Sequence, residues 1–225
     1  MLRILFLFFF ASILLNANSQ GYALKHLTIK DGLPDDGIRA LFKDSRGYLW
    51  IGTDAGVSRF DGNEFVNYNS MDGLAGEAVW SIAEDGLGRM WFGCYGSGVS
   101  VFDGENFTNL KREDSLKNIG IRVLRYCEQS NTVLAGCQDG VIRFNMDLTF
   151  SEFSSRNGDN ERAMLIGAVY QYTEDTAIIS SMGGPTFLYC FSKDSIFKTP
   201  DNHRFQKANG RCSTVSGGKY YLGSG

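Results

Sequence analysis

The sequence has little histidine and no strong clustering of charge. Only two histidines occur among 225 residues, and no Gly-x-Ser-x-Gly motif is present, so a serine–histidine–aspartate catalytic set is improbable. The formal net charge is −3, and no run of like charges exceeds three residues. Because phosphate binding needs clustered lysine and arginine, this composition argues against nucleic acid as a partner.

Long apolar runs are also missing after residue 20. Before it, Arg3 is followed by the predominantly apolar residues 4–15, and Ala17–Ser19 supply small residues. This order predicts a secretory signal peptide at residues 1–19, cleaved after Ser19, and hence an exported, periplasmic protein. The alternative is an uncleaved anchor, but twelve residues fall short of the ~20 that a membrane-spanning helix needs.

Cysteine is present, but its pattern is weak evidence for a disulfide framework. The count is odd and the spacing is wide. We expect Cys94 to be a small apolar packing residue. Cys127 and Cys137 flank a candidate turn at residues 128–131, so a disulfide across a hairpin stays open.

What the sequence does contain is a repeat. Residues 44–65 and 85–107 are nearly the same, and Trp50 matches Trp91 at an offset of 41. At an offset of 42 the residues Gly56, Phe60, Asp61, Gly62 and Phe65 match Gly98, Phe102, Asp103, Gly104 and Phe107. A repeat of this length made of short strands is typical of a β-propeller.

Each repeat predicts four short strands. In the first repeat they are Ile38–Lys43, Tyr48–Thr53, Val57–Phe60 and Glu64–Tyr68. The fold class predicted is therefore all-β, a propeller of four-stranded antiparallel blades. We expect Trp50, Phe60 and Phe65 to pack between neighbouring blades. Type I′ turns are expected at the Asp–Gly pairs that begin at Asp31, Asp61, Asp72, Asp103 and Asp139.

The repeats predict one domain, residues 20–225, that forms an incomplete ring. Blades are expected at about 35–70, 76–110, 119–153 and 163–198, with a partial blade at 203–225. Leu24–Leu33 aligns with Phe65–Leu74 at an offset of 41, so residues 22–30 are predicted to be a closing strand. Such a strand pairs with the last blade of a ring. We therefore expect the missing C-terminal blades of a longer protein as its partners.

The candidate binding residues lie at the predicted rim, where loops from several blades converge. Tyr95 is placed to stack on a sugar face. Arginine donors in the loops between blades are Arg112, Arg156, Arg162 and Arg204. The alternative is that each is a solvated loop residue. Arg39, Trp80 and Arg122 share one repeat position, and we expect packing at an inter-blade seam from them.

No metal site, cofactor or catalytic residue is predicted. Gly96–Gly98 reads as a hairpin turn, since a phosphate loop would need a following helix. Asn157–Asn160 has a faint likeness to a calcium loop but lacks the alternating ligands and the terminal glutamate.

The stretch Leu27–Pro34, followed by Asp44–Gly62, closely resembles the two-component regulator propeller repeat, as do Asp72–Leu74 and Trp91–Gly93. The resemblance implies the periplasmic, non-catalytic sensor end of a hybrid histidine kinase anchored in the inner membrane. It also implies an oligosaccharide ligand and downstream signalling modules in the same protein, and it allows a homodimer of the full-length protein. The alternatives are a secreted propeller enzyme acting on polysaccharide and an adhesion or scaffold propeller that binds a protein partner.

Overall fold

A computed structural model describes residues 24–110, 120–138, 140–154, 165–182, 185–199, 210–216 and 219–224. The predicted signal peptide lies outside the described residues, as do the calcium-like loop and Asp139. Within the described ranges, no helix has the length and apolar character needed to cross a membrane.

Four antiparallel four-stranded sheets follow one another along the chain, and we call them blades one to four. Blade one is β1 (Ile38–Lys43), β2 (Leu49–Thr53), β3 (Gly56–Phe60) and β4 (Phe65–Tyr68). Blade two is β5 (Val79–Glu84), β6 (Met90–Cys94), β7 (Gly98–Phe102) and β8 (Phe107–Leu110). Blade three is β9 (Val123–Cys127), β10 (Thr132–Gly136), β11 (Gly140–Asn145) and β12 (Phe150–Ser154). Blade four is β13 (Ile166–Gln171), β14 (Thr176–Ser181), β15 (Thr186–Cys190) and β16 (Ser195–Lys198).

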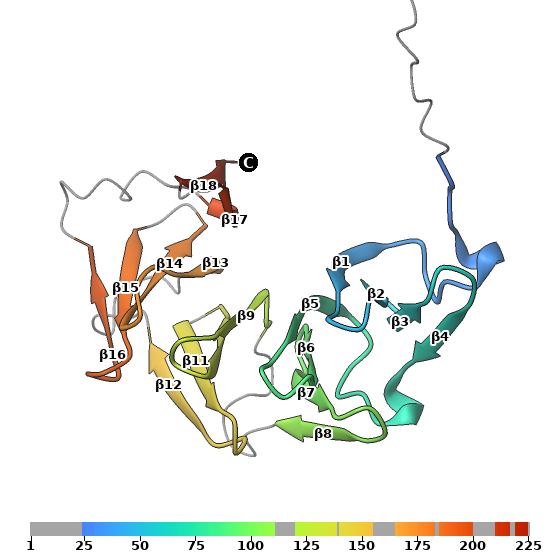
Figure 1. Cartoon of the computed structure of the whole chain (residues 1–225), viewed down its shortest axis with the longest axis horizontal. Helices are drawn as coiled ribbons and strands as arrows, with labels where there is room; N and C mark the ends of the chain where they lie inside the picture. The colour runs from blue at the N-terminus through green and yellow to red at the C-terminus, as the bar shows by residue number, and fades with distance from the viewer. Residues whose placement is uncertain are drawn as a thin grey trace, which may run out of the picture.

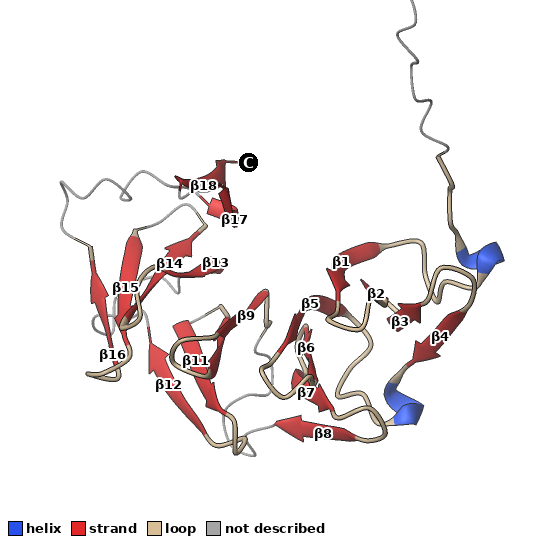
Figure 2. Ribbon diagram, in the orientation of Figure 1, coloured by secondary structure: helices blue, strands red, loops and turns tan. Residues whose placement is uncertain are grey.

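The blades are arranged as an open arc (Figure 1). The first strand of each blade lies on the concave side, and the fourth lies on the convex side. A two-stranded sheet, β17 (Gly210–Ser216) and β18 (Lys219–Ser224), follows blade four. Figure 2 shows that strands dominate, with two short helical turns outside the sheets. The predicted all-β propeller fold with an unclosed ring is confirmed.

A buried aspartate fixes the first turn of blades one and two. Asp85 Oδ1 accepts hydrogen bonds from the backbone N–H groups of Leu87 (2.9 Å) and Arg89 (3.0 Å). Its Oδ2 accepts from Trp91 Nε1 at 2.8 Å and Arg89 Nε at 2.7 Å. Asp44 does the same for Trp50 Nε1 at 2.8 Å. Because each carboxylate is buried, these bonds satisfy charge and donors that water cannot reach.

The tryptophan so held packs onto the next blade. Trp50 lies with its ring centroid 5.3 Å from Phe92 and 6.1 Å from Phe102 of blade two. Trp91 in turn lies 5.5 Å from Phe144 of blade three. The prediction that Trp50 packs between blades is confirmed. Each tryptophan buries almost its whole surface, so these contacts supply much of the apolar burial at the seams.

Phe60 and Phe65 face the segment that precedes blade one. Their rings stack on each other with centroids 4.4 Å apart, and Phe65 contacts the backbone at Gly32, where a Cβ would lie 3.1 Å from the ring. In blade two the equivalent residues, Phe102 and Phe107, both contact Tyr68 of the preceding blade. No described blade lies on the corresponding side of blade one, so packing of Phe60 and Phe65 between blades stays a prediction.

The strand predicted at residues 22–30 is not formed over its described part. Residues 24–28 have no regular structure, and η1 (Ile29–Asp31) is a short 3-10 turn. Thr28 and Asp31 cap this turn reciprocally, as Asn69 and Asp72 cap η2 (Ser70–Asp72) after blade one. No described strand pairs with residues 24–28, so these residues lack the ladder partner that would make them a strand.

The Asp–Gly pairs form turns, but not of type I′, which needs positive φ at both central residues. In the pairs at Asp31, Asp61, Asp72 and Asp103, only the glycine has positive φ. Asp61 instead accepts hydrogen bonds from the backbone N–H groups of Glu64 (2.8 Å) and Asn63 (2.7 Å). These bonds lower the pKa of the Asp61 carboxyl. Side-chain capping therefore shapes these loops, which the dipeptide alone does not reveal.

Cys127 and Cys137 do not form the disulfide that the sequence left open, since both are free thiols. Cys127 pairs with Thr132 across the β9–β10 hairpin, whereas Cys137 follows the far end of β10. Five residues of strand separate the two ends by about 16 Å, well beyond the ~7 Å limit for bridged Cα atoms. Burial raises the pKa of the Cys127 thiol to about 12. Cys94 is buried in the core between blades one and two, as predicted.

An ion pair between Arg143 and Asp194 joins blades three and four. Arg143 Nη1 lies 2.7 Å from Asp194 Oδ1, and the Tyr189 hydroxyl donates to the same oxygen. Burial tends to raise the pKa of Asp194, but the hydrogen bonds from Tyr189 and Arg143 outweigh it and the pKa is lowered.

Removal of the buried Asp85 carboxylate should destabilise the fold. Asp85→Ala leaves the indole N–H, two backbone N–H groups and the Arg89 guanidinium without their acceptor. We expect the free energy of unfolding to fall by about 3–5 kcal/mol, measured by urea denaturation. Asp103→Ala, at an exposed turn, is the matched control and should cost much less, because water replaces the lost acceptor. Equal losses in the two variants would contradict the assignment.

The ion pair between Asp194 and Arg143 should make the stability of the fold depend on pH in the acid range. Because its folded pKa is lowered, its contribution is fully present above the unfolded pKa of about 3.9 and is lost as pH falls through the folded value. The wild type should exceed Asp194→Asn in stability by about 1 kcal/mol or less at pH 6, and the gap should close as the pH falls through the lowered folded pKa of Asp194. Thermal unfolding across this range measures it. A gap that widens on acidification would refute the sign.

Candidate functional site

In three of the four blades, the ladder between the first and second strands shifts register and leaves one residue of the first strand unpaired. These unpaired residues occupy equivalent positions in their blades. The β1–β2, β5–β6 and β13–β14 ladders shift register between Ile38 and Ala40, Val79 and Ser81, and Ile166 and Ala168. The residues left over are Arg39, Trp80 and Gly167. Such bulges re-aim a side chain away from the ladder. In blade three, Arg122 stands at this position, directly before β9, with its N–H donated to Gly136 O at 3.0 Å.

These four residues line one cavity. Arg39, Trp80, Arg122 and Gly167, together with Met182, surround a volume of about 270 Å³. They come from all four blades, and the first strands that carry them face the concave side of the arc (Figure 1). The cavity therefore lies where a ligand can touch several blades at once, as ligand sites at convergent elements do.

Aromatic rings and guanidinium groups meet at this cavity. Trp80 and Tyr95 stack with centroids 4.4 Å apart and planes 19° apart. The Arg122 Cζ atom lies 4.9 Å from the Trp80 centroid and 5.6 Å from that of Tyr95. Arg39 Cζ lies 5.3 Å from Trp80. Cations within about 6 Å of a ring centroid are attracted by the ring quadrupole, so the cluster is held together by cation–π contacts.

The two arginines differ in their charge partners. Arg39 Nε donates to Asp54 Oδ1 at 2.8 Å, and its Nη2 lies 2.5 Å from Oδ2. This bidentate pair lowers the pKa of Asp54 and raises that of Arg39, although its exposure means that it contributes little to stability. Among the described residues Arg122 has no ion-pair partner, and its Nε is buried without an acceptor. Trp80 Nε1 is buried without an acceptor too.

Tyr95 is positioned from two sides by backbone. Its N–H donates to Ala78 O at 2.8 Å, and it forms an isolated β-bridge with Gly120. A Cβ atom on Gly120 would lie 2.4 Å from the Tyr95 ring. The absence of a side chain at residue 120 is what allows the ring to lie on Trp80. Tyr95 remains 37% exposed, so part of the ring is open to a ligand.

Of the residues that the sequence put forward for binding, Tyr95 belongs to this cluster. The loop arginines Arg112, Arg156, Arg162 and Arg204 lie outside the described residues. The sequence put Arg39, Trp80 and Arg122 at one repeat position and predicted packing at an inter-blade seam. They do contact one another across blades, and they also line the cavity, which was not predicted. One feature of the sequence could have indicated this role. The three residues differ in chemistry, whereas positions of a repeat that serve only packing usually keep similar residues.

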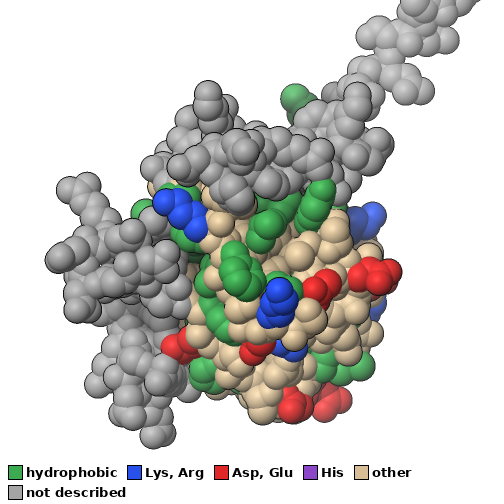
Figure 3. Space-filling model, turned by 90° about the vertical axis from the view of Figure 1, so that its left-hand side faces the viewer, with side chains coloured by type: hydrophobic (Ala, Val, Ile, Leu, Met, Phe, Trp, Pro, Cys, Tyr) green, Lys and Arg blue, Asp and Glu red, His purple; other side chains and the backbone are tan. Residues whose placement is uncertain are grey.

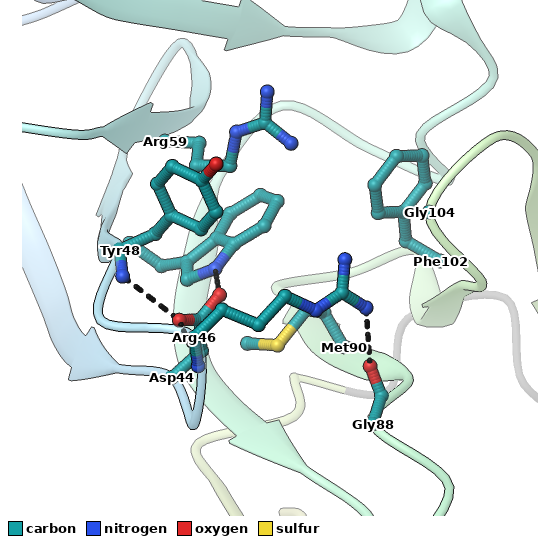
Figure 4. A pocket seen from close by; sticks show the side chains of 9 residues that line it. Asp44, Arg46, Tyr48, Arg59, Gly88, Met90, Phe102 and Gly104 are labelled. Atoms are coloured by element: carbon teal, nitrogen blue, oxygen red, sulfur yellow. Dashed lines mark hydrogen bonds between the residues drawn. The ribbon is translucent and has the colours of Figure 1, made fainter.

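A second hollow shows what a seam between blades looks like (Figure 4). It lies between blades one and two, beside the Asp44–Trp50 hydrogen bond. Arg46 reaches across to Gly88 O at 3.4 Å, and Arg59 lies over Tyr48 at 4.8 Å. The cavity holds about 10 Å³, room for about one water molecule. It is therefore packing space. In the described ranges no group of three or more His, Cys, Asp or Glu is placed to hold a metal ion.

The comparison with known families agrees with the repeat analysis. The family described as "Two component regulator propeller" matches this chain at residues 32–55 and 73–96. The chain carries two-component regulator propeller repeats. Histidine kinase P4 of Formosa agariphila is 36% identical over 64 residues, which are 28% of this chain and 5% of that protein.

Solved structures share the propeller fold at low identity. The extracellular domain of a hybrid two component system from B. thetaiotaomicron matches with a TM-score of 0.72 at 14% identity, over 91% of this chain and 30% of that one. Virginiamycin B lyase from Staphylococcus aureus matches with a TM-score of 0.69 at 14% identity, over 89% of this chain and 66% of that one. The chain thus spans about a third of the sensor domain it resembles, and these likenesses establish the fold.

Substitution of Gly120 should disturb the stacked pair. In Gly120→Ala the new methyl group occupies the place of the Tyr95 ring, so the ring must leave Trp80. We expect acrylamide to quench tryptophan fluorescence more strongly, because Trp50 and Trp91 are buried and only Trp80 becomes more accessible. Tyr95→Ala should give the same rise. In a Tyr95→Ala background, Gly120→Ala should add nothing, and additive effects would contradict this account.

Proposed function

We propose that this chain is part of the exported sensing propeller of a two-component system and that it binds a saccharide at the cavity lined by Arg39, Trp80 and Arg122. The observation that carries the proposal is the stacked Trp80–Tyr95 pair at a cavity shared by four blades. Aromatic surfaces suit the apolar faces of sugar rings, and guanidinium groups suit their oxygen atoms.

The comparisons support the signalling context. The repeats are those of two-component regulators, a relative with detectable sequence identity is a histidine kinase, and a structural neighbour is the extracellular domain of a hybrid two component system. The apolar leader predicted at residues 1–19 agrees with export. The kinase output, the periplasmic location and the response to glycans are part of the proposal.

The position of the cavity suggests how binding is transmitted. Its lining residues lie in or beside the inner strands of four different blades. A ligand that contacts several of them stabilises one relative arrangement of the blades over others by its differential affinity. The chain itself needs no catalytic step for this role, since binding energy alone shifts the equilibrium.

A propeller enzyme is the second candidate, and the likeness to two lyases favours it. Streptogramin B lyase matches with a TM-score of 0.62 at 13% identity, besides the virginiamycin B lyase. Of the described carboxylates near the cavity, Asp54 is engaged by Arg39, and Asp35 lies close enough to raise the pKa of the same arginine. An enzyme would convert an oligosaccharide or a streptogramin during incubation with the purified complete protein, whereas a sensor would bind its ligand and release it unchanged.

Removal of the Trp80 ring should weaken ligand sensing without unfolding the protein. The complete protein is tested for glycan-dependent autophosphorylation with oligosaccharides from pectin, alginate, carrageenan, xylan and laminarin. Trp80→Leu removes the stacked ring, and we expect the half-saturating concentration of the active oligosaccharide to rise about tenfold.

Phe197→Ala is the matched control, because Phe197 is 47% exposed on the convex-side strand β16. Its dose–response curve should coincide with that of the wild type. An unchanged curve for Trp80→Leu, or a protein that none of the oligosaccharides activates, would contradict the proposed function.

A further inference from the structure

Two buried N–H donors at the cavity have no acceptor among the described residues. They are Trp80 Nε1 and Arg122 Nε, and both residues line the same 270 Å³ volume. Burial of a donor without an acceptor is unfavourable. Both nitrogen atoms have almost no accessible surface, so a ligand that enters the cavity would meet the terminal N–H groups of Arg122 and not these two atoms.

The charge of the cavity favours an anionic acceptor. Asp54 engages Arg39 with both carboxylate oxygens. Arg122 contacts the rings of Trp80 and Tyr95 instead, and no described carboxylate pairs with it. A cation–π contact does not use the guanidinium N–H groups as an ion pair does, and these N–H groups are the ones that bind carboxylate or sulfate oxygens. Arg122 is thus the uncompensated cation of the described site.

The size of the cavity and its aromatic wall restrict what carries the anion. Small-molecule sites usually measure about 300–1,000 Å³, so 270 Å³ suits a sugar unit or two and not a long chain. Tyr95, with its ring partly exposed, offers a flat surface beside Arg122. A free inorganic anion would use the guanidinium but not this surface.

We propose that the cavity binds an acidic saccharide, with the terminal N–H groups of Arg122 holding a carboxylate or sulfate substituent and the Trp80–Tyr95 pair lying beside the sugar ring. The inference rests on the proposed function, in which this cavity takes a saccharide, and names the ligand class. Anion selectivity then resides in one arginine, and Arg39 serves to hold Trp80.

The experiment is calorimetric titration of the complete protein with matched pairs of ligands. Trigalacturonate and its fully methyl-esterified form share the same sugar backbone and differ in the carboxylate charge and the added methyl groups. A carrageenan tetrasaccharide and its desulfated form differ only in sulfate. Sodium sulfate alone tests for a free anion. The protein variants are Arg122→Gln, Arg122→Lys and the control Arg125→Gln. Arg125 is exposed on β9, which begins directly after Arg122, and its guanidinium lies over Tyr170.

We expect one acidic ligand to bind at least tenfold more tightly than its neutral partner, and its identity separates carboxylate from sulfate. Arg122→Gln should weaken that binding about 10- to 100-fold, the loss expected for a charge-assisted hydrogen bond. Arg122→Lys should keep part of it, and Arg125→Gln should match the wild type. Circular dichroism and thermal midpoints confirm that each variant is folded.

Equal affinity for the charged and neutral members of both pairs would overturn the inference and leave the proposed saccharide sensing standing. Binding of sodium sulfate as tight as that of the acidic saccharides would overturn it as well. If no ligand binds, the inference also fails, and the autophosphorylation assay decides separately whether the sensing proposal fails with it. A loss in Arg125→Gln equal to that in Arg122→Gln would show a general charge effect and reject Arg122 as the binding residue.

Discussion

The structure depends on a buried carboxylate that accepts hydrogen bonds from its own turn and from the tryptophan six residues later. Asp44 and Asp85 each close a tight turn with one oxygen and hold the indole of Trp50 or Trp91 with the other. The turn sets where the second strand begins, and the indole sets how far the next blade can approach. One side chain thereby links local backbone geometry to the packing of whole sheets, which explains the Asp-x-x-Gly-x-x-Trp spacing of both strong repeats.

Blades three and four keep the architecture without this device. Leu134 and Ile178 occupy the tryptophan position on β10 and β14, and both are buried. Their aliphatic side chains need no acceptor, so the aspartate is not required there. Blade four is instead tied to blade three by Arg143, Asp194 and Tyr189. The repeat fades in sequence because different residues meet the same packing demand.

Much of the fold could be predicted from the sequence, because strand alternation, glycine turns and aromatic spacing are local signals. The strand predicted at Ile38–Lys43 has those bounds in the structure. The prediction failed where the structure depends on a partner strand, as at residues 24–28. It also failed where side-chain capping shapes a turn, as at Asp61. The site was harder. Tyr95 was identified from its turn, but the roles of Arg39, Trp80 and Arg122 depend on ladder irregularities and on contacts between blades that residue spacing does not encode.

The irregular position at the start of each inner strand has a consequence for ligand binding. Arg39, Trp80, Arg122 and Gly167 stand at it, and neither the aspartate–indole bonds nor the buried clusters between blades include them. Under the proposed function, substitutions at these four positions would alter ligand binding without removing the contacts that join the blades. The residues that hold the blades together are thus distinct from the residues that would contact a ligand.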